Sequence, residues 1–414
     1  MITRRGILGG LGLGGLGLGA LAGVLAPIRA LRADGGSDRY LVVYWAKGGW
    51  DPSYVFDPHF GSPTVEGDSF AEADSKGGIA FANAITRPAV QSFLEAWGSR
   101  SVVINGVTVG SISHVACTQL MLTGLRSESA ADVASLVAVG TGGDLALPNL
   151  ILSGPRFPGK YGATSIPLSA TLLGTARGTA PVAPYNAGDE TAVRAWLTEQ
   201  AGSMAFPNSA HLGVEYAAGL QRRALLEAVA SSFPTPAGNE EADLLAAGIS
   251  ALTLGLSRAF MMEGSFPQRS HWDSHQDNQA NQDACFQHTF TQLTNLMAAL
   301  SAASAPNGGT LADKTTVLVL SEMGRTPVRN ATGGKDHWPF TSAMMIGEGI
   351  SGGRVLGVSD EALVGQTVDL DTGEASESGA RVTPAGMFAG LLESFDLDPS
   401  DALPGIAPFR APWV

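Results

Sequence analysis

Short apolar runs alternate with amphipathic stretches along most of this chain. Residues 40–46 (YLVVYWA) are apolar and rich in β-branched and aromatic side chains, and a Lys-Gly-Gly sequence ends the run. The runs 102–104 and 316–320 (TVLVL) are similar, and all three predict buried strands. Strands without polar alternation are typical of a parallel sheet that is covered on both faces.

Helical spacing appears between and beside these runs. Apolar residues recur every three or four positions from Leu245 to Phe260, behind a predicted cap at Asn239. The same spacing extends from Phe286 to Leu300, and a further helix is expected over roughly 211–231. Strands that alternate with helices predict an α/β fold, with a mixed, mostly parallel central sheet flanked by helices on both faces.

The middle of the chain interrupts this alternation. Residues 140–188 are rich in glycine, proline, alanine and threonine, which predicts irregular loops or a cap over the sheet. We therefore expect one domain over residues 34–414, with a cap or insertion region at about 140–240.

The first 33 residues have the organisation of an export signal. Arg4 and Arg5 precede an uncharged run, rich in glycine and leucine, that ends near Leu25. This order predicts a twin-arginine signal peptide, with the twin-arginine translocase as a partner during export. Cleavage is expected after Ala33, which would release a periplasmic or secreted protein. The alternative is an uncleaved membrane anchor, because roughly 18 apolar residues can just span a bilayer.

The net charge and the number of cysteines limit the partners and the covalent links that the protein can have. The formal net charge of -13 argues against nucleic acid as a partner. An anionic substrate would need local positive charge, most simply from a metal ion. Cys117 and Cys285 are the only cysteines in the sequence, so no disulfide framework is expected, and whether these two pair stays open.

Polar residues follow the predicted strands, where ligands gather in open α/β sheets. Asp51 comes directly after Gly48 and Gly49, and it is either a helix cap or a metal ligand. Ser113 and His114 follow the second strand, at the expected start of a helix. A serine there is most simply a cap, but its hydroxyl is also a candidate nucleophile if a metal ion lowers its pKa.

Two further clusters combine histidines with acidic residues. Asp273 and His275 form an Asp-x-His pair that can reach one metal ion from an extended segment, although His275 could instead cap the helix that follows. After the third strand come Glu322 and Arg325, and the same loop continues to an Asp-His pair at 336 and 337. Arg325 either pairs with Glu322 or binds a tetrahedral anion bidentately.

These clusters together resemble an exported family catalogued as domain of unknown function 1501, which is similar in fold to the alkaline phosphatase and sulfatase superfamily. The resemblance covers the chain from about Tyr40 to its end. It rests on motifs that occur in a fixed order: GGWD at 48–51, SH at 113–114, WDSH at 272–275, SEMGRTP at 321–327 and GKDHW at 334–338.

The superfamily resemblance implies a site with one or two divalent ions (Zn, Mg, Mn or Ca) and a hydroxyl nucleophile at a helix N-terminus. Ser113 takes the nucleophile's place, with His114 as the alternative if the register shifts by one residue. Arg325 would stabilise charge on the substrate, and His114 or His337 would protonate the leaving group. The metal ligands implied by the resemblance are Asp51, Asp273, His275, Glu322, Asp336 and His337.

One departure from the superfamily pattern affects the expected metal content. Met323 stands where phosphatases of this class have a histidine, and a thioether is a poor ligand for hard divalent ions. A single well-bound metal ion, or Mg or Ca with oxygen ligands, is therefore plausible.

The activity that the resemblance implies is metal-dependent hydrolysis of a phosphate or sulfate ester, either on a small molecule or on a polymer. The alternative is a non-catalytic exported protein, for binding or for cell-surface assembly, that keeps a vestigial or structural metal site. The chain has no Cys-x-Pro-x-Arg run of the kind that yields the oxidised nucleophile of one sulfatase group. The sequence gives no prediction of oligomeric state.

Overall fold

The computed structural model describes residues 38–169, 237–266 and 270–413, together with scattered positions between 192 and 234. The predicted signal over 1–33, most of the predicted helix over 211–231 and much of the predicted cap lie outside the described residues. Within the described part of the chain, no helix combines the length and the apolar character needed to cross a membrane.

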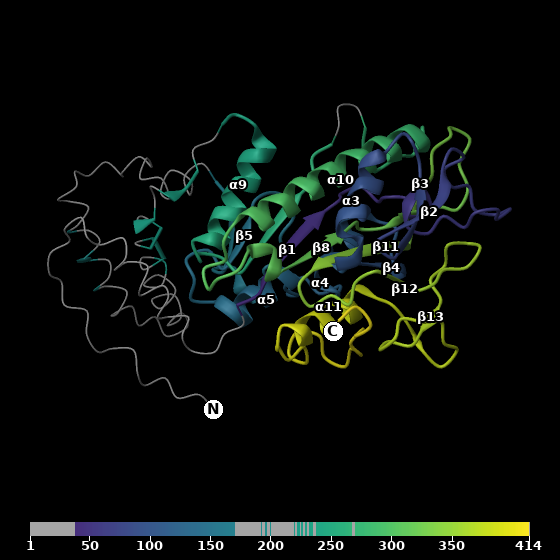
Figure 1. The fold of residues 1–414 in the computed structure, drawn as a ribbon. Helices are drawn as coiled ribbons and strands as arrows, with labels where there is room; N and C mark the ends of the chain where they lie inside the picture. Colours follow the sequence, from purple (N-terminus) through teal and green to yellow (C-terminus); the bar gives the residue numbers. More distant parts are fainter. Residues whose placement is uncertain are drawn as a thin grey trace. The chain divides into compact units, whose positions relative to one another are not determined.

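An eight-stranded sheet forms the centre of the described chain (Figure 1). Its strands are β1 (Tyr40–Trp45), β4 (Ser101–Thr108), β5 (Asn149–Ile151), β6 (Ser165–Pro167), β7 (Ala259–Glu263), β8 (Thr315–Leu320), β11 (Phe340–Gly347) and β12 (Arg354–Leu356). They lie in the order β12-β4-β11-β8-β1-β7-β5-β6. β11 is antiparallel to both neighbours, whereas the other adjacent pairs in this sheet are parallel. The predicted mixed, mostly parallel sheet is therefore confirmed.

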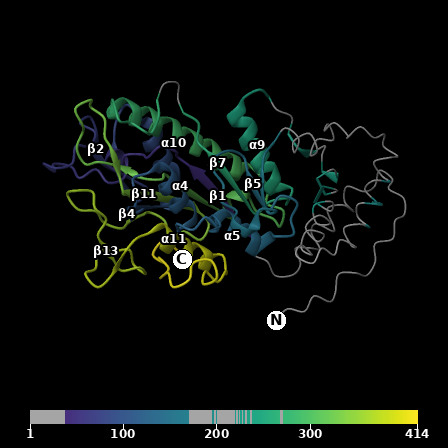
Figure 2. The ribbon, with the colours of Figure 1, turned by 180° about the vertical axis from the view of Figure 1, so that it is seen from behind.

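Helices cover both faces of this sheet (Figures 1 and 2). One face carries α3 (Pro88–Trp97), α9 (Glu240–Thr253) and α10 (Asn278–Ala302). The other carries α4 (His114–Thr123), α5 (Val133–Gly142) and α11 (Pro384–Ser394). Alternate residues of β1 serve the two cores: Val42 belongs to the first and Val43 to the second, and both are completely buried.

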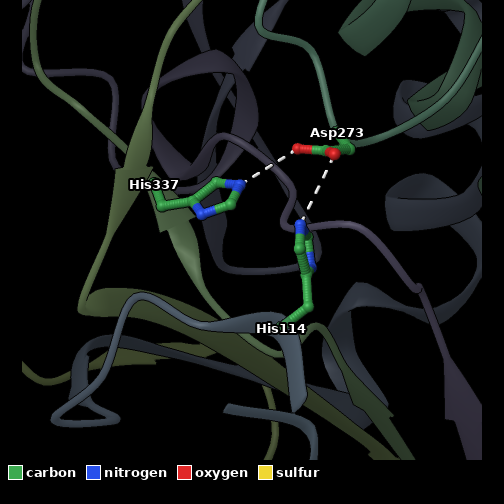
Figure 3. A group of neighbouring side chains, drawn as sticks. All are labelled: His114, Asp273 and His337. Carbon is green, nitrogen blue, oxygen red and sulfur yellow. Dashed lines mark hydrogen bonds and ion pairs between the residues drawn. The ribbon is translucent and has the colours of Figure 1, made fainter. Parts of the chain in front are cut away.

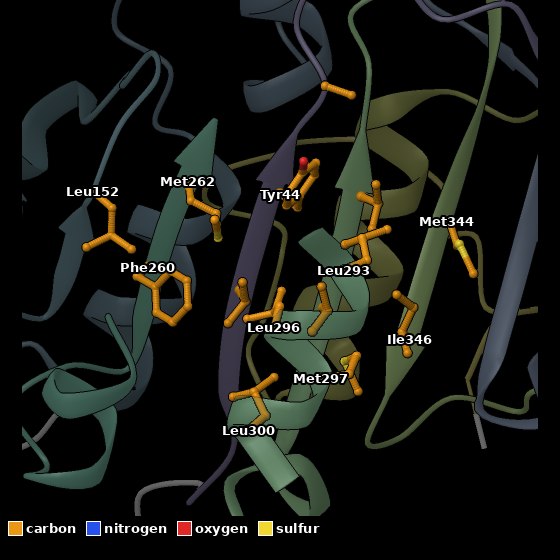
Figure 4. Close-up of a cluster of buried hydrophobic side chains, with 14 of the residues drawn as sticks. Tyr44, Leu152, Phe260, Met262, Leu293, Leu296, Met297, Leu300, Met344 and Ile346 are labelled. Atoms are coloured by element: carbon orange, nitrogen blue, oxygen red, sulfur yellow. The ribbon is translucent and has the colours of Figure 1, made fainter. Parts of the chain in front are cut away.

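The long helix α10 contributes one side of the first core. Leu293, Leu296, Met297 and Leu300 recur at helical spacing along its sheet-facing side, as the sequence predicts, and they face side chains of the central strands (Figure 4). Cys285 of α10 lies in this core, whereas Cys117 of α4 lies in the other, and both thiols are free.

Several shorter elements lie outside the central sheet. These are α2 (Pro52–Val55), the hairpin of β2 (Glu72–Lys76) and β3 (Ile79–Asn83), the antiparallel pair of β9 (Gly324–Arg325) and β10 (His337–Trp338), and the pair of β13 (Thr367–Val368) and β14 (Ala380–Arg381). The described residues also include 3-10 turns at Gly98–Arg100, Gly159–Tyr161 and Leu311–Asp313.

Two predictions need correction. The helix expected to reach Phe260 ends at Thr253, and the chain then turns at Gly255 (φ +70°) and enters β7. Phe260 matches the helical spacing by coincidence, because it is a buried strand residue paired with Val42 and Leu150. The expectation of irregular loops over 140–188 is wrong at β5 and β6, which extend the parallel sheet by two strands.

The topology brings distant polar segments to one edge of the sheet. β1, β4, β7 and β8 all run in one direction, so the loops that follow them emerge at the same edge. Because β11 runs the opposite way, its preceding segment with β10 starts from that edge too. Each of the predicted polar clusters lies on one of these segments.

Candidate metal centre

Side chains from separate loops meet at this edge in a His/Asp cluster (Figure 3). His114 begins α4, Asp273 lies on the loop after β7, and His337 belongs to β10. One potential ligand atom from each of these residues lies within 4.8 Å of the others. Asp273 is the centre of the group: Nε2 of His114 is 3.4 Å from its Oδ2, and Nε2 of His337 is 3.1 Å from its Oδ1.

A third imidazole joins this cluster. Nε2 of His275 is 3.2 Å from Oδ1 of Asp273 and 3.0 Å from Nε2 of His337. The alternative in which His275 caps α10 is not what the structure shows, since Asp277 occupies the N-cap position of that helix. We call the group of His114, Asp273, His275 and His337 the His/Asp centre.

Each imidazole of the His/Asp centre is held from behind through Nδ1. Nδ1 of His114 is 2.9 Å from Oε1 of Glu322, and Nδ1 of His275 is 2.9 Å from Oδ1 of Asp336. Nδ1 of His337 is 2.8 Å from the backbone oxygen of Ile112. Carbonyl and ionised carboxylate oxygens only accept hydrogen bonds, so Nδ1 carries the proton in each ring. This is the arrangement in which metal-binding histidines are usually held.

The opposite ring nitrogens face the inside of the centre. Each Nε2 is directed at the Asp273 carboxylate or at another Nε2 atom. Nε2 of His114 is buried and has no hydrogen-bond partner. Imidazole nitrogens and a carboxylate that converge in this way are the ligand types of zinc sites, so the residues fit a metal ion.

Several contacts within the centre are close to the ligand spacing of a tetrahedral ion. Nitrogen ligands lie about 2.0–2.1 Å from a zinc ion, so two ligand atoms of a tetrahedron are about 3.3 Å apart. The Nε2 atoms of His275 and His337 and Oδ1 of Asp273 are 3.0, 3.1 and 3.2 Å apart, and Nε2 of His114 is 3.4 Å from Oδ2 of the same carboxylate. A borderline ion such as Zn²⁺ suits three imidazoles and a carboxylate better than Mg²⁺ or Ca²⁺ does, because those two prefer oxygen ligands.

Arg325 lies under Asp273 rather than toward solvent. Its guanidinium is completely buried and donates to the backbone oxygens of Gly48, Gly49 (2.8 Å) and Lys335 (3.1 Å), and to Oδ1 of Asp273 at 2.8 Å. Burial raises the pKa of Asp273, but Arg325 and His337 lower it by more, to about 2. The carboxylate is therefore ionised and fixed in place, while the guanidinium has no free edge for a substrate anion.

Glu322 orients the centre from the end of β8. It is nearly completely buried, and both of its oxygens accept from the backbone N–H of Gly48, at 2.7 and 2.9 Å. Its bond to His114 raises the pKa of that imidazole, although burial of the ring opposes the rise. Glu322 therefore lies behind a candidate ligand instead of in the ligand shell, and Asp336 has the same place behind His275.

Asp51 is not among the side chains that meet at the His/Asp centre. It caps α2, and its Oδ1 accepts from the backbone N–H and the hydroxyl of Ser53. Oδ2 is 2.8 Å from Nζ of Lys335 and 2.9 Å from Nδ2 of Asn278. Both carboxylate oxygens are thus engaged by protein donors, and the nearest cation is an ammonium group.

Ser113 is exposed at the N-cap position of α4, immediately before His114. Its side chain makes no capping hydrogen bond, in contrast to the cap that the sequence favours. The hydroxyl is therefore exposed at the N-terminus of the helix that begins with His114, and helix N-termini favour bound anions. His114 and His337, the predicted proton donors, have both ring nitrogens directed at protein groups.

Sequence reasoning missed several residues that shape this site. The backbone oxygen of Ile112 fixes His337, the Lys335 ammonium neutralises Asp51, and Gln282 binds the backbone oxygen of Trp272 at 3.0 Å. A lysine within the GKDHW motif was the available signal for Lys335. A backbone carbonyl leaves no signal in the sequence.

The sheet and the His/Asp centre define an α/β protein with a candidate metal site at the carboxyl edge of its strands. Residues 240–402 match the family model described as "Protein of unknown function (DUF1501)", which confirms the family resemblance over this part of the chain. The segment includes Asp273, His275 and His337, whereas His114 lies outside it. No curated protein matched the chain.

Solved structures with a similar course of chain include members of the alkaline phosphatase superfamily. One protein of that superfamily from Vibrio parahaemolyticus is 9% identical, with 90% of this chain and 74% of that chain covered and a TM-score of 0.37. The phosphonate monoester hydrolase of Agrobacterium radiobacter is 12% identical (89% and 78% covered, TM-score 0.36). A sulfatase from Pseudoalteromonas sp. is 9% identical (95% and 78% covered, TM-score 0.34). At this level the likeness is a similarity alone, and the α/β class rests on the sheet topology.

Proposed function

We propose that this protein is a metal-dependent hydrolase of phosphate or sulfate esters with one metal ion at the His/Asp centre. The observation that carries the proposal is the convergence of the Nε2 atoms of three imidazoles on the Asp273 carboxylate, each ring being held through Nδ1. His114, Asp273, His275 and His337 would hold the ion. A bound divalent ion would act as a Lewis acid toward an ester oxygen.

The chain itself would supply the remaining parts of the reaction. Ser113 places an uncapped hydroxyl next to ligand His114, in reach of a substrate bound at the centre. The first backbone N–H groups of α4 would bind the anionic oxygens of the ester. Arg325 would act as a positioning residue, because its contacts keep Asp273 ionised and directed at the imidazoles.

The test combines metal analysis with a substrate screen. Purified protein is expected to contain about one zinc or manganese ion per chain and to hydrolyse at least one of aryl phosphates, phosphodiesters and aryl sulfates. The double variant His275→Ala/His337→Ala is expected to lose both metal and turnover. If wild-type protein and this variant contain equal amounts of metal, the proposed ligand set is wrong.

A non-catalytic binding or cell-surface assembly protein is the second candidate. It is favoured by the number of ligands, because four protein side chains can close the shell of a structural zinc ion, whereas catalytic sites keep a position open. Against it stands the exposure of the centre: His275 is 44% exposed, so a further ligand can approach from solvent. Metal that is bound without turnover of any ester in the screen would support this candidate.

Export by the twin-arginine pathway remains part of the proposal. Arg4, Arg5 and the glycine- and leucine-rich run that follows them support it. Replacing both arginines with lysine is expected to keep the protein in the cytoplasm, as measured by cell fractionation. A normal distribution of this variant would contradict the proposal.

A further inference from the structure

A second charged group is formed by residues of the same loops and is shielded from solvent. Nζ of Lys335 is 2.8 Å from Oδ2 of Asp51 and 3.0 Å from Oγ of Ser53, and all three residues are completely buried. The Ser53 hydroxyl donates to Oδ1 of Asp51, so it turns a lone pair toward the ammonium. A carboxylate and a hydroxyl oxygen thus surround one positive charge. Oxygen donors of this kind also suit a hard divalent ion.

The backbone connects this pair to the ligand segments. The N–H of Lys335 donates to the backbone oxygen of Ser274 at 3.0 Å, between Asp273 and His275. Its carbonyl accepts from Nη1 of Arg325 at 3.1 Å, and the next residues in the chain are Asp336 and His337. The backbone of Lys335 is therefore bonded directly to the segments that carry Asp273 and His337.

The charge of Asp51 requires a partner in this buried place. An unpaired buried carboxylate costs several kcal/mol, because burial removes the hydration of the charge. The other donors to Asp51, which are Asn278 and Ser53, carry no charge. Without the ammonium, Asp51 has to take up a proton or another cation.

We propose that the Lys335 ammonium occupies a cation position formed by Asp51 and Ser53, and that it thereby restricts the site to a single metal ion. Removal of this side chain turns the position into a second metal site for a hard divalent ion such as Mn²⁺. The inference rests on the proposed function for the first ion, at the His/Asp centre, but the contents of the second position can be measured separately.

The experiment uses full-length protein that is saturated with Zn²⁺, then exposed to Mn²⁺ and desalted. Elemental analysis and the electron paramagnetic resonance signal of Mn²⁺ give the content of each ion. Wild-type protein is expected to hold about one zinc and no manganese, whereas Lys335→Ala gains about one manganese per chain. The double variant Asp51→Asn/Lys335→Met is the matched control. It removes both charges and is expected to gain no manganese.

Manganese bound to the wild-type protein would overturn the proposal, and so would a folded Lys335→Ala protein without manganese. If Lys335→Ala does not fold, Lys335→Ser serves in its place, because its short side chain also leaves the position open and carries no charge. Wild-type protein without zinc would contradict the proposed function alone, since the manganese comparison between variants still decides the second position. Circular dichroism confirms that each variant is folded.

Discussion

Glu322 is a buried residue whose charge is used to direct one imidazole. It accepts the Nδ1 proton of His114 with Oε1, and it accepts the backbone N–H of Gly48 with both oxygens. Asp336 makes the corresponding bond to His275, but its side chain is 60% exposed, against 1% for Glu322. The carboxylate–imidazole bond should be stronger for buried Glu322 than for exposed Asp336, because water screens the exposed charge.

We therefore predict that Glu322→Gln weakens metal binding more than Asp336→Asn does. The amide still fits sterically but holds the Nδ1 proton less strongly, and loss of such a partner typically lowers metal affinity about 10–100-fold. Competition titrations with a chromogenic chelator would measure both variants. Equal affinities for the two variants would show that burial of the carboxylate has no influence.

Arg325 leads to a prediction about stability. Arg325→Met leaves three backbone oxygens without their donor, and each buried unsatisfied group costs about 1–3 kcal/mol. We expect the free energy of unfolding in urea to fall by at least about 3 kcal/mol. Arg126→Met is the control, because Arg126 is exposed and its contact is with one backbone oxygen, that of Gly110. An Arg325→Met protein of wild-type stability would favour the anion-binding role predicted from sequence.

The residues that form the site could be predicted from the sequence. Which of them are candidate ligands, and which hydrogen-bond to the ligands from behind, could not. The structure gathers Asp273, His275 and His337 in one cluster with His114, and it places Glu322 and Asp336 behind two of the rings. Carboxylates serve equally well as ligands and as partners of ligands. Which role applies depends on which ring nitrogen faces which oxygen, and that geometry is set by loops distant in sequence.

At the scale of elements, the turn after β1 controls how closely two loops approach. Gly48 adopts φ +123°, and a Cβ atom there would lie 2.8 Å from Cβ of Trp272 and 2.9 Å from the backbone nitrogen of Asp273. The glycine thus lets the turn pack directly against the segment that carries Asp273.

Gly48→Ala is predicted to push this segment away, which lowers both metal affinity and stability. Gly61→Ala is the control, because Gly61 also has a positive φ (+79°) but open space around its Cβ position. We expect the control to lose about 1 kcal/mol through backbone strain alone and to keep its metal affinity. Unfolding in urea and metal titration would test both variants, and equal metal affinity in the two would contradict the close-packing argument.

The start of α4 provides a test that separates a cap from a nucleophile. Ser113 makes no capping bond, whereas Thr383 at the start of α11 accepts from the backbone N–H of Gly386 at 3.1 Å. Ser113→Ala is therefore expected to change stability by less than about 0.5 kcal/mol, and Thr383→Ala to cost about 1 kcal/mol. Ester turnover should be lost in the first variant and retained in the second. Equal destabilisation would restore the capping interpretation of Ser113.

Strong local patterns predicted the strands β1, β4 and β8 and the helix α10, since each has an uninterrupted apolar run or a long periodic one. The prediction failed at β7, where Leu256 and Phe260 continue the spacing of α9 although the chain has already turned at Gly255. β5 has only three residues, Asn149–Ile151, and is a strand because it pairs with β6 and β7. Such pairing depends on tertiary structure, which a local window does not contain.

At the scale of the molecule, the proposed ion would join segments that belong to different strands. Its ligands follow β4 and β7 and precede β11, so an ion bound only by the folded state stabilises the domain as a whole. At a free concentration 1,000-fold above the dissociation constant, the expected gain is about 4 kcal/mol.

Chelation is therefore predicted to lower the melting temperature, and added zinc to restore it. Differential scanning calorimetry with and without a chelator would measure the change. The variant His275→Ala/His337→Ala should melt at the same temperature in both conditions, because it has lost two of the proposed ligands. A wild-type melting temperature that does not respond to chelator would exclude a stabilising ion.

The placement of the two thiols has a practical consequence. Cys117 and Cys285 lie in the cores on opposite faces of the central sheet, so the sheet itself prevents a covalent link between them in the native state. Folding to the native state therefore requires no disulfide bond between these cysteines and no oxidising agent to form one. Recombinant production in an ordinary reducing host should yield the same domain as an oxidising one.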